Sequence, residues 1–392
     1  MTFKSKLQVS ITVLLVLFSP LAIDIYLPAI PIIASSFHVE HALAQDTIAW
    51  FLFAMGIGQL FAGPLADRYG RKVVAVCGIV LYGASSYLAS AATSIDWLLL
   101  ARLLQGFGAC ATSVAAFATV RDLFGANKSG QMISYLNGAI CFIPALAPIL
   151  GSFLTQAYGW RSNFSFMTLF ALVVGLVVVT QMKETNKSKA VGPIFSLERY
   201  KSVLSSDTFQ FHALLCMLAM AVILAYVSAA PIVLMEGFGL SMNEFTYWFG
   251  ANAAINIAAA FIAPKIMQSK GSHFTLISGI SLIVAAGIGM LLLLNVDHPF
   301  AFMGPVFLSS AGFSMILGAA AGKALAPFGN KAGTAAALLG LIQMSGAGMF
   351  VGTSQRLGLE PQQSIALHML IITPALIILM SRKGKKWHEV YS

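Results

Sequence analysis

Two charged residues lie inside long apolar stretches of the sequence. Asp24 falls within "SPLAIDIYLPAIP", residues 19–31, and Arg102 follows the apolar segment 97–101. Burying either charge at membrane depth is costly, so such residues have a partner or line a water-filled cavity, and they mark functional sites by default. Two interpretations are open: a static ion pair that fixes packing, or a cavity-lining pair that takes part in transport.

The expected depths of the two residues favour a pair. Asp24 lies about eight residues before the outer end of its span and Arg102 about five after the outer start of its own, which places them roughly 12 and 8 Å below the same face. Pro20 and Pro28 interrupt the span that holds Asp24. Such interruptions are tolerated where neighbours or cavity water satisfy the backbone. A kinked span carrying Asp24 and Tyr26 is predicted as a cavity wall, unless the kink merely improves packing.

The composition requires a surface that faces lipid. Hydrophobic residues make up 58% of the 392 residues and charged residues 9%, and the mean hydropathy is +0.84. A soluble domain carries roughly 25% charged residues. Apolar windows of about 20 residues, long enough to cross a hydrocarbon core of ~30 Å, recur along the chain. The chain is therefore predicted to be an all-α, multi-pass membrane protein.

Polar, Gly and Pro residues separate the apolar windows into twelve predicted spans. The first six are 8–32, 45–65, 73–93, 97–119, 131–156 and 163–182. The other six are 209–233, 244–267, 273–294, 299–323, 333–354 and 363–381. This division predicts two six-helix bundles, 1–182 and 209–392, joined by a cytoplasmic loop at 183–208, with a short basic cytoplasmic tail on the second bundle.

Basic residues orient the spans, since loops retained in the cytoplasm are rich in Lys and Arg. With the N-terminus inside, twenty of the 23 Lys and Arg residues fall on the cytoplasmic side and only Arg161 and Arg356 fall in outside loops. Both termini are therefore predicted to be cytoplasmic. The net charge of +9 reflects this topology, so we expect no nucleic-acid partner.

Motifs of enzyme and cofactor sites are missing from the sequence. It contains no Walker-type phosphate loop, metal-spaced His/Glu helix or nucleophile elbow, so we expect no enzyme activity, cofactor or metal. "HVEH", residues 38–41, is expected to be a solvated outside loop, and the four cysteines have no paired spacing. His212, His368 and Lys323 lie near span ends, where interfacial placement explains them.

Small residues are dense in the fifth and eleventh predicted spans, at 137–153 and 332–352. They let helix backbones approach closely, so we expect both spans at the interface between the halves, with Gln343 as the polar cavity candidate there.

Pro64 and Pro264 hold matching places after the second and eighth spans. This favours two related halves, a common transporter plan.

These segments together resemble the major facilitator superfamily, specifically its twelve-span drug:proton antiporter branch. "GPLADRYGRK" (63–72) matches the loop signature of the superfamily, and "RLLQGFGA" (102–109) resembles its Arg-x-x-Gln-Gly motif, associated with proton coupling. "PALAPILGS" (144–152) resembles the antiporter motif, from which Ala147 and Ser152 depart. "DIYLPAIP", "ATVRDLF" and "AGTAAALLGLIQM" are similar to the bicyclomycin and chloramphenicol resistance (Bcr/CflA) group.

The resemblance implies roles for individual residues. Asp24 would be the proton-exchanging carboxylate, with Arg102 as its coupling partner. Asp67 would hold the outward-open state by facing the N-terminal end of the eleventh span, near Gly333 and Thr334, where a carboxylate is favoured. The latch motif comprises Gly63, Asp67, Arg68, Gly70 and Arg71, and the antiporter motif comprises Pro144, Pro148 and Gly151. The cavity candidates, chosen as polar-tipped or aromatic groups among apolar walls, are Tyr26, Phe53, Tyr226, Asn252, Asn256 and Gln343.

Three functions remain open for a chain expected in the bacterial inner membrane. The first is proton-coupled export of small amphipathic drugs by alternating access. The second is export of a native metabolite such as a siderophore or an amino-acid derivative, and the third is a proton-coupled importer or a sensor without transport. The expected partners are a small-molecule substrate, protons and membrane lipid, with the chain acting as a monomer.

Overall fold

The computed structural model describes residues 3–186, 197–328 and 332–388, and these residues form helices and turns without a strand. The chain divides into two units, Met1–Leu197 and Glu198–Ser392. Residues 187–196 of the predicted interdomain loop lie outside the described residues. The assignment of 183–208 as that loop stays a prediction.

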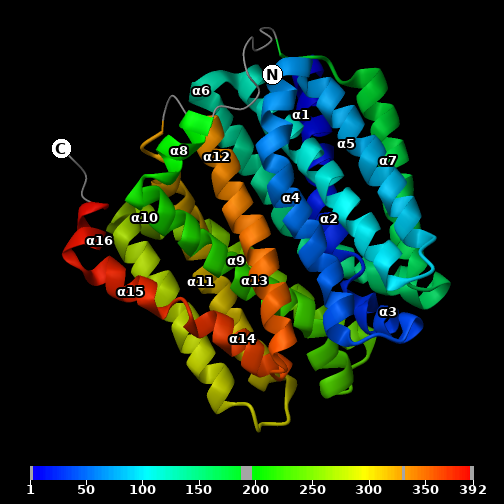
Figure 1. The fold of residues 1–392 in the computed structure, drawn as a ribbon, viewed down its shortest axis with the longest axis vertical. Helices are drawn as coiled ribbons and strands as arrows, with labels where there is room; N and C mark the ends of the chain where they lie inside the picture. Colours follow the sequence, from blue (N-terminus) through cyan, green and yellow to red (C-terminus); the bar gives the residue numbers. More distant parts are fainter. Residues whose placement is uncertain (1–2, 187–196, 329–331, 389–392) are drawn as a thin grey trace. The chain divides into compact units, whose positions relative to one another are not determined.

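The first unit contains seven α-helices and one 3₁₀ helix among its described residues that precede the unit boundary (Figure 1). They are α1 (Phe3–Val16), α2 (Phe18–Asp24), η1 (Leu27–Ala29), α3 (Ile30–Phe37), α4 (His41–Tyr69), α5 (Arg71–Ser90), α6 (Ile95–Tyr158) and α7 (Arg161–Gln181). Helix α8 (Leu197–Leu204) begins at the boundary itself.

The described part of the second unit contains α-helices, two π-helical turns and one 3₁₀ helix. The elements are α9 (Asp207–Pro231), η2 (Ile232–Gly237), α10 (Met242–Leu292), α11 (Pro299–Leu325), α12 (Ala332–Gly340), η4 (Leu341–Gly346), α13 (Ala347–Ser354), η5 (Gln355–Leu357), α14 (Pro361–Leu370), α15 (Thr373–Met380) and α16 (Arg382–Lys386). The π-helical turns are η2 and η4. Single π-turns inside α-helices are often found at functional sites.

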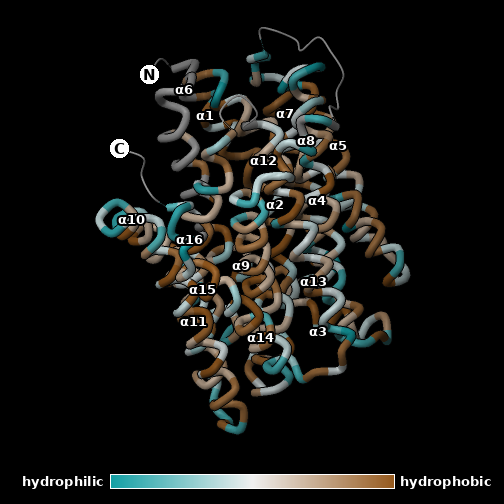
Figure 2. Tube along the Cα trace, turned by 60° about the vertical axis from the view of Figure 1, so that its left-hand side comes forward, coloured by the Kyte–Doolittle hydropathy of each residue, from teal (hydrophilic) through white to brown (hydrophobic). Residues whose placement is uncertain are grey.

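Ten described helical segments are long and apolar enough to cross a membrane. One of them, α10, covers two predicted spans because its path bends at Gly271, whose φ of 81° and ψ of 166° are not helical. A shorter apolar segment, Phe142–Tyr158, corresponds to the fifth predicted span. The twelve predicted spans are thereby all represented. Figure 2 shows hydrophobic residues along the middle of the helices and hydrophilic residues mostly at their ends.

The first span is broken where its prolines predict a break. It is built from α1, α2, η1 and α3 rather than from one helix. Pro28 stands in the first turn of η1 and Pro31 in the first turn of α3. Proline is tolerated in a first turn because the N–H it lacks would have no intrahelical partner there. The result is an irregular stretch of backbone directly after Asp24.

Helix α6 contains two spans that return past the same part of the first span. The guanidinium carbon of Arg102 lies 4.7 Å from the ring centroid of Tyr26, and a Cβ on Gly151 would lie 1.6 Å from the carbonyl oxygen of Ile25. A straight helix would separate Arg102 from Gly151 by about 70 Å. Because both residues contact neighbouring residues of the first span, α6 reverses direction between them.

Candidate functional site

The break in the first span places Asp24 at the end of a short helix. Asp24 is the last residue of α2, and Tyr26 follows with a φ of −101° and a ψ of 1° before η1 begins. The carboxyl group is buried, with only 5% of the residue exposed. No hydrogen bond or ion pair joins it to another described residue. A buried carboxyl without such a partner is rare and marks a functional site.

Arg102 is fully buried in α6 and is surrounded by aromatic and neutral polar groups. Its Nε donates a hydrogen bond to the backbone carbonyl of Thr47 at 3.1 Å, and its Nη1 donates to Oε1 of Gln105. The guanidinium also lies over two rings, 4.7 Å from the centroid of Tyr26 and 4.5 Å from that of Phe51. Such cation–π contacts are strongest away from water. They supply the attraction that a carboxylate would otherwise provide.

A second layer of hydrogen bonds holds the partners of Arg102 in place. The Tyr26 hydroxyl lies 2.9 Å from Oγ1 of Thr47. Gln105 donates from Nε2 to Oγ of Ser86 at 2.7 Å and to Sδ of Met167 at 3.2 Å. The cluster thus joins the first span to α4, α5, α6 and α7. In this arrangement, contacts with the first span, α4, α5 and α7 hold Arg102 and its partners.

The expected ion pair between Asp24 and Arg102 is not formed. Arg102 bonds to Thr47 and Gln105, and its electrostatic partners are the two tyrosines Tyr26 and Tyr82. The depth estimate was based on rise along each helix, which gives height but not the direction in which a side chain points. The two side chains are therefore not bonded in this structure, and their roles in proton coupling stay predictions.

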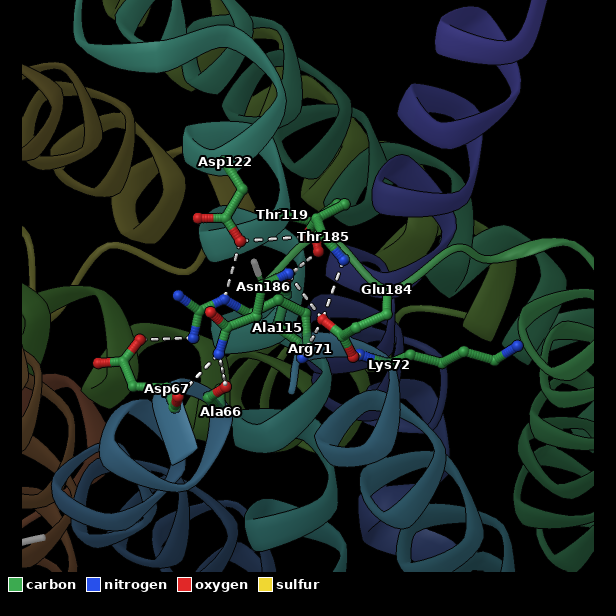
Figure 3. A network of polar contacts seen from close by, with 10 residues as sticks. All are labelled: Ala66, Asp67, Arg71, Lys72, Ala115, Thr119, Asp122, Glu184, Thr185 and Asn186. Atoms are coloured by element: carbon green, nitrogen blue, oxygen red, sulfur yellow. Dashed lines mark hydrogen bonds and ion pairs between the residues drawn. The ribbon is translucent and has the colours of Figure 1, made fainter. Parts of the chain in front are cut away.

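A second polar cluster lies at the end of the first unit that the basic residues assign to the cytoplasm, and Figure 3 shows it. Arg71, whose side chain is 10% exposed, donates from Nη1 to Asp67 at 2.5 Å and from Nε to Asp122 at 3.0 Å. Asp67 is 55% exposed and Asp122 24% exposed. The more buried pair with Asp122 is screened less by water, so it contributes more to holding α5 against α6.

The segment 184–186, which follows α7, binds the turn between α4 and α5, and this set of contacts is called the clamp. Glu184 accepts backbone N–H groups of Arg71 at 3.0 Å and of Lys72 at 3.1 Å, both in the first turn of α5. Asn186 donates to the carbonyl oxygen of Asp67 at 2.7 Å, in the last turn of α4. Residues of one short segment therefore satisfy free backbone groups of two helix ends.

Gly70 makes this clamp possible. It joins α4 to α5 with a φ of 110°, which residues with a side chain rarely adopt. A Cβ at this position would also lie 2.3 Å from Oε2 of Glu184. The glycine of the loop signature is therefore required both for the turn and for the approach of the carboxylate.

The hydrogen bonds to Glu184 keep it charged. Burial alone would raise the pKa of Glu184, but backbone N–H groups of Asn186, Arg71, Lys72 and Thr185 outweigh it and hold the pKa below its ordinary value. A carboxyl with a lowered pKa stabilises the fold above its ordinary pKa, and this contribution is lost as the pH falls through the lowered value. The clamp is therefore intact at neutral pH.

We predict that Glu184→Ala destabilises the first unit. The change removes the acceptor of N–H groups at the start of α5, and losing such a cap typically costs about 0.5–2 kcal/mol. The measurement is the thermal unfolding midpoint of the purified protein in detergent. Glu40→Ala is the matched control, because Glu40 precedes α4 but makes no side-chain cap. Equal midpoints for the two variants would contradict the assigned role of Glu184.

The predicted latch motif is only partly gathered into this cluster. Asp67, Gly70 and Arg71 take part, whereas Arg68 is exposed and lies over the ring of Tyr69 at 5.8 Å. Gly63 lies in α4, and nothing lies within 4 Å of where its Cβ would be. The approach of Asp67 to Gly333 and Thr334 stays a prediction.

The antiporter motif lies in the part of α6 that follows its reversal. Pro148 and Gly151 are buried and Pro144 is half-buried. Gly151 packs directly against the backbone of Ile25, the residue after Asp24. The small residue of the motif thus allows close helix approach within the first unit, next to the buried carboxyl group.

Three of the predicted cavity residues lie in aromatic or apolar surroundings. Phe53 in α4 is half-buried, with its ring centroid 6.4 Å from that of Trp50. In the second unit, Tyr226 is buried and stacks on Phe249, with 5.7 Å between centroids and 16° between ring planes. Asn252 is buried in α10. Their role in substrate binding stays a prediction.

The other two candidates of the second unit lie at polar contacts or irregular backbone. Asn256 accepts a hydrogen bond on Oδ1 from the hydroxyl of Ser314 at 2.5 Å, which links α10 to α11. Gln343 is buried within the π-helical turn η4. Placement of Gln343 at an interface between the halves also stays a prediction.

Three residues of the site were missed by the sequence analysis. Asp122 belongs to "ATVRDLF", which was read only as a resemblance, although a carboxylate among cytoplasmic basic residues was a usable signal. Glu184 lies 113 positions from Arg71 in the chain, and no local pattern connects them. Thr47 contributes through its backbone carbonyl to Arg102, for which residue type gives no signal.

Comparison with known proteins agrees with this architecture. The family model described as Major Facilitator Superfamily matches residues 12–352. The chain is 33% identical over 357 residues to "Multidrug resistance protein MdtL" of Citrobacter koseri, covering 91% of this chain and 89% of the relative. It is 32% identical to the protein of the same name from Klebsiella pneumoniae, with the same coverage.

Solved structures show the same fold at low sequence identity. A bacterial homologue of the human lysosomal transporter Spinster, inward-facing and unoccupied, superposes with a TM-score of 0.76 and 17% identity over 100% of both chains. A D-xylose–proton symporter gives 0.74 and 16% over 99% of both chains. The family model and the multidrug resistance relatives identify a multi-pass membrane transporter rather than an enzyme. The chain belongs to the major facilitator superfamily and is a bacterial inner-membrane protein.

Proposed function

We propose that the chain exports small amphipathic organic molecules by alternating access, in exchange for protons that enter the cell, and that Asp24 carries the exchanged proton. The observation that carries this proposal is the buried carboxyl of Asp24, which has no bonding partner among the described residues and stands at a helix break. A carboxyl group binds and releases a proton without any cofactor. Its burial at membrane depth is explained by such a task better than by packing.

The position of Arg102 supports a role in proton coupling. It lies over the ring of Tyr26, two residues after Asp24, yet does not bond to Asp24. An opposite charge within about 4–6 Å favours the ionised form of a carboxyl. A shift of Arg102 toward Asp24 during the cycle would therefore release the proton, and its return to the aromatic rings would allow a proton to bind.

The relatives support the substrate class. Proteins that share 32–33% of their residues with this chain are called multidrug resistance proteins. The candidate residues Tyr26, Phe53 and Tyr226 are aromatic, which suits amphipathic ligands. We further propose that the chain acts as a monomer surrounded by membrane lipid.

Transport by reconstituted protein tests the proposal. Proteoliposomes that contain the purified chain are given labelled chloramphenicol or bicyclomycin, with a pH gradient directed so that proton efflux drives drug uptake. We expect drug accumulation that collapses when a protonophore removes the gradient, together with a drug-dependent pH change inside the vesicles. Equal drug accumulation with and without the pH gradient would overturn the proposed proton coupling.

A native metabolite is the second candidate substrate, because the same scaffold and coupling serve either function. A strain lacking the gene separates the two candidates. If the chain exports drugs, the strain should be more sensitive to drugs and the metabolites in its medium should be unchanged. If the chain exports a metabolite, a siderophore or an amino-acid derivative should be missing from the medium.

A further inference from the structure

The C-terminal segment Arg382–His388 ends in a histidine that bonds to two helices of the second unit. His388 Nε2 lies 3.4 Å from Nε2 of His212 in α9, and His388 Nδ1 lies 2.9 Å from Oγ of Ser272 in α10. The ring of His273 is also close, with 5.3 Å between its centroid and that of His388. Three histidine rings thus meet where the segment Arg382–His388 packs on α9 and α10.

Aromatic packing completes the docking of this segment. The ring of Trp387 lies 4.9 Å from that of Phe211 and 5.8 Å from that of His212. His212 is fully buried beneath it, and its interfacial depth near a span end stays a prediction. Two adjacent residues, Trp387 and His388, therefore hold the segment against α9.

The hydrogen bonds of the two bonded histidines are consistent with neutral rings. Nδ1 of His212 lies 2.7 Å from the carbonyl oxygen of Thr208, and because a carbonyl only accepts, this nitrogen carries the proton. Nε2 of His212 is then an acceptor, and Nε2–H of His388 donates to it. Nδ1 of His388 accepts from the Ser272 hydroxyl. Every bond is satisfied with one proton on each ring.

Burial and neighbouring positive groups disfavour a further proton on His388. The groups that act on His388 are His212 on α9, His273 on α10 and Lys323 on α11, and all three disfavour a positive charge. Burial is the largest effect, and together they lower the pKa of His388 to about 3. Within the described part of the chain no carboxylate opposes this.

The residues of the segment Arg382–His388 itself add to the positive charge. The segment carries Arg382, Lys383, Lys385 and Lys386. Glu389, the next residue in the chain, lies outside the described residues. A protonated His388 in the docked position would therefore be a half-buried cation among basic groups, which is costly unless it is paired.

We propose that Arg382–His388 forms a pH-sensitive clasp, which docks on α9 and α10 while His388 is neutral and detaches when His388 is protonated. The basic residues assign this end of the unit to the cytoplasm, so the clasp would respond to cytoplasmic pH. Its docking does not depend on the proposed transport activity. If that activity holds, the clasp senses the compartment into which the exchanged protons are released.

The direction of the pH effect follows from the two states. A detached His388 titrates near the ordinary histidine pKa of about 6.5, whereas the docked residue stays neutral far below it. Docking is therefore strongest above the ordinary value and weakens as the pH falls below it. The ratio of docked to detached molecules falls about tenfold between about pH 7.5 and about pH 5.5 for one proton.

Spin labels on the clasp and on α10 measure this ratio. Nitroxides are attached at Lys385→Cys and Ser269→Cys, which replace exposed residues, in full-length protein whose native cysteines are changed to alanine. We expect a short-distance population at neutral pH that shrinks about tenfold relative to the long-distance population at about pH 5.5. An unchanged distance distribution across this range would overturn the proposal.

Two substitutions separate the titration from the docking contacts. His388→Gln cannot take up the proton and should remain docked across the pH range, whereas His388→Arg is permanently charged and should be detached throughout. His298→Gln is the control, because His298 is exposed at the start of α11, and it should respond to pH like the parent. A pH response retained in His388→Gln, or a docked His388→Arg, would show that His388 is not the sensor.

Discussion

Asp24→Asn abolishes uphill accumulation of drug in proteoliposomes, reducing it to the level of vesicles without protein. Asparagine has nearly the shape of aspartate but cannot exchange a proton, so a proton gradient can no longer drive export. The folded state loses no bond, because Asp24 makes no hydrogen bond or ion pair to another described residue. Its unfolding midpoint should therefore match that of the parent, and drug binding should persist.

The controls for this prediction separate coupling from general damage. Asp96→Asn changes an exposed carboxyl in the first turn of α6 and should leave accumulation unchanged. Drug counterflow, which needs no proton gradient, should survive in Asp24→Asn. If that variant still concentrates drug against its gradient, Asp24 is a packing or recognition residue and the coupling assignment is wrong.

Gly151→Ala is expected to damage the first unit more than any loop substitution considered above. The added Cβ would lie 1.6 Å from the carbonyl oxygen of Ile25, so the backbone of α6 or of the first span must move. Overpacking of this kind typically costs about 1–3 kcal/mol, occasionally more. Because Ile25 follows Asp24 directly, the shift should also reduce proton-driven transport. Thermal unfolding in detergent and drug uptake measure the two effects.

Gly318→Ala is the matched control for this second prediction. Gly318 lies inside α11, and nothing lies within 4 Å of where its Cβ would be. Alanine is favoured over glycine in a helix by up to about 1 kcal/mol, so this variant should be as stable as the parent or more so. If Gly151→Ala matched Gly318→Ala in stability, the close approach of α6 to Ile25 would be refuted.

Much of the fold followed from hydropathy and proline positions, because both act locally. The breaks before η1 and α3 stand at Pro28 and Pro31, and the bend of α10 at Gly271 separates two apolar runs that were predicted as two spans. Lipid excludes polar backbone, so an apolar window of sufficient length has few alternatives to a spanning helix. These features need no knowledge of distant contacts.

The candidate site was harder to predict because it depends on where side chains point. Arg102 was recognised as a buried charge, yet its expected partner was Asp24 and its actual contacts are Thr47, Gln105 and the rings of Tyr26 and Phe51. Height along a helix does not determine rotation about its axis. Cation–π contacts also leave no mark in a sequence, since aromatic residues in a membrane span are common for other reasons.

The single residue between α4 and α5 has a consequence for how the protein is made. Helix α4 ends at Tyr69 and α5 begins at Arg71, so Gly70 alone connects them. A connection of one residue is too short to let one helix cross the bilayer while the other remains outside it. We therefore expect the two helices to be inserted during biosynthesis as one helical hairpin, with its basic tip on the cytoplasmic side.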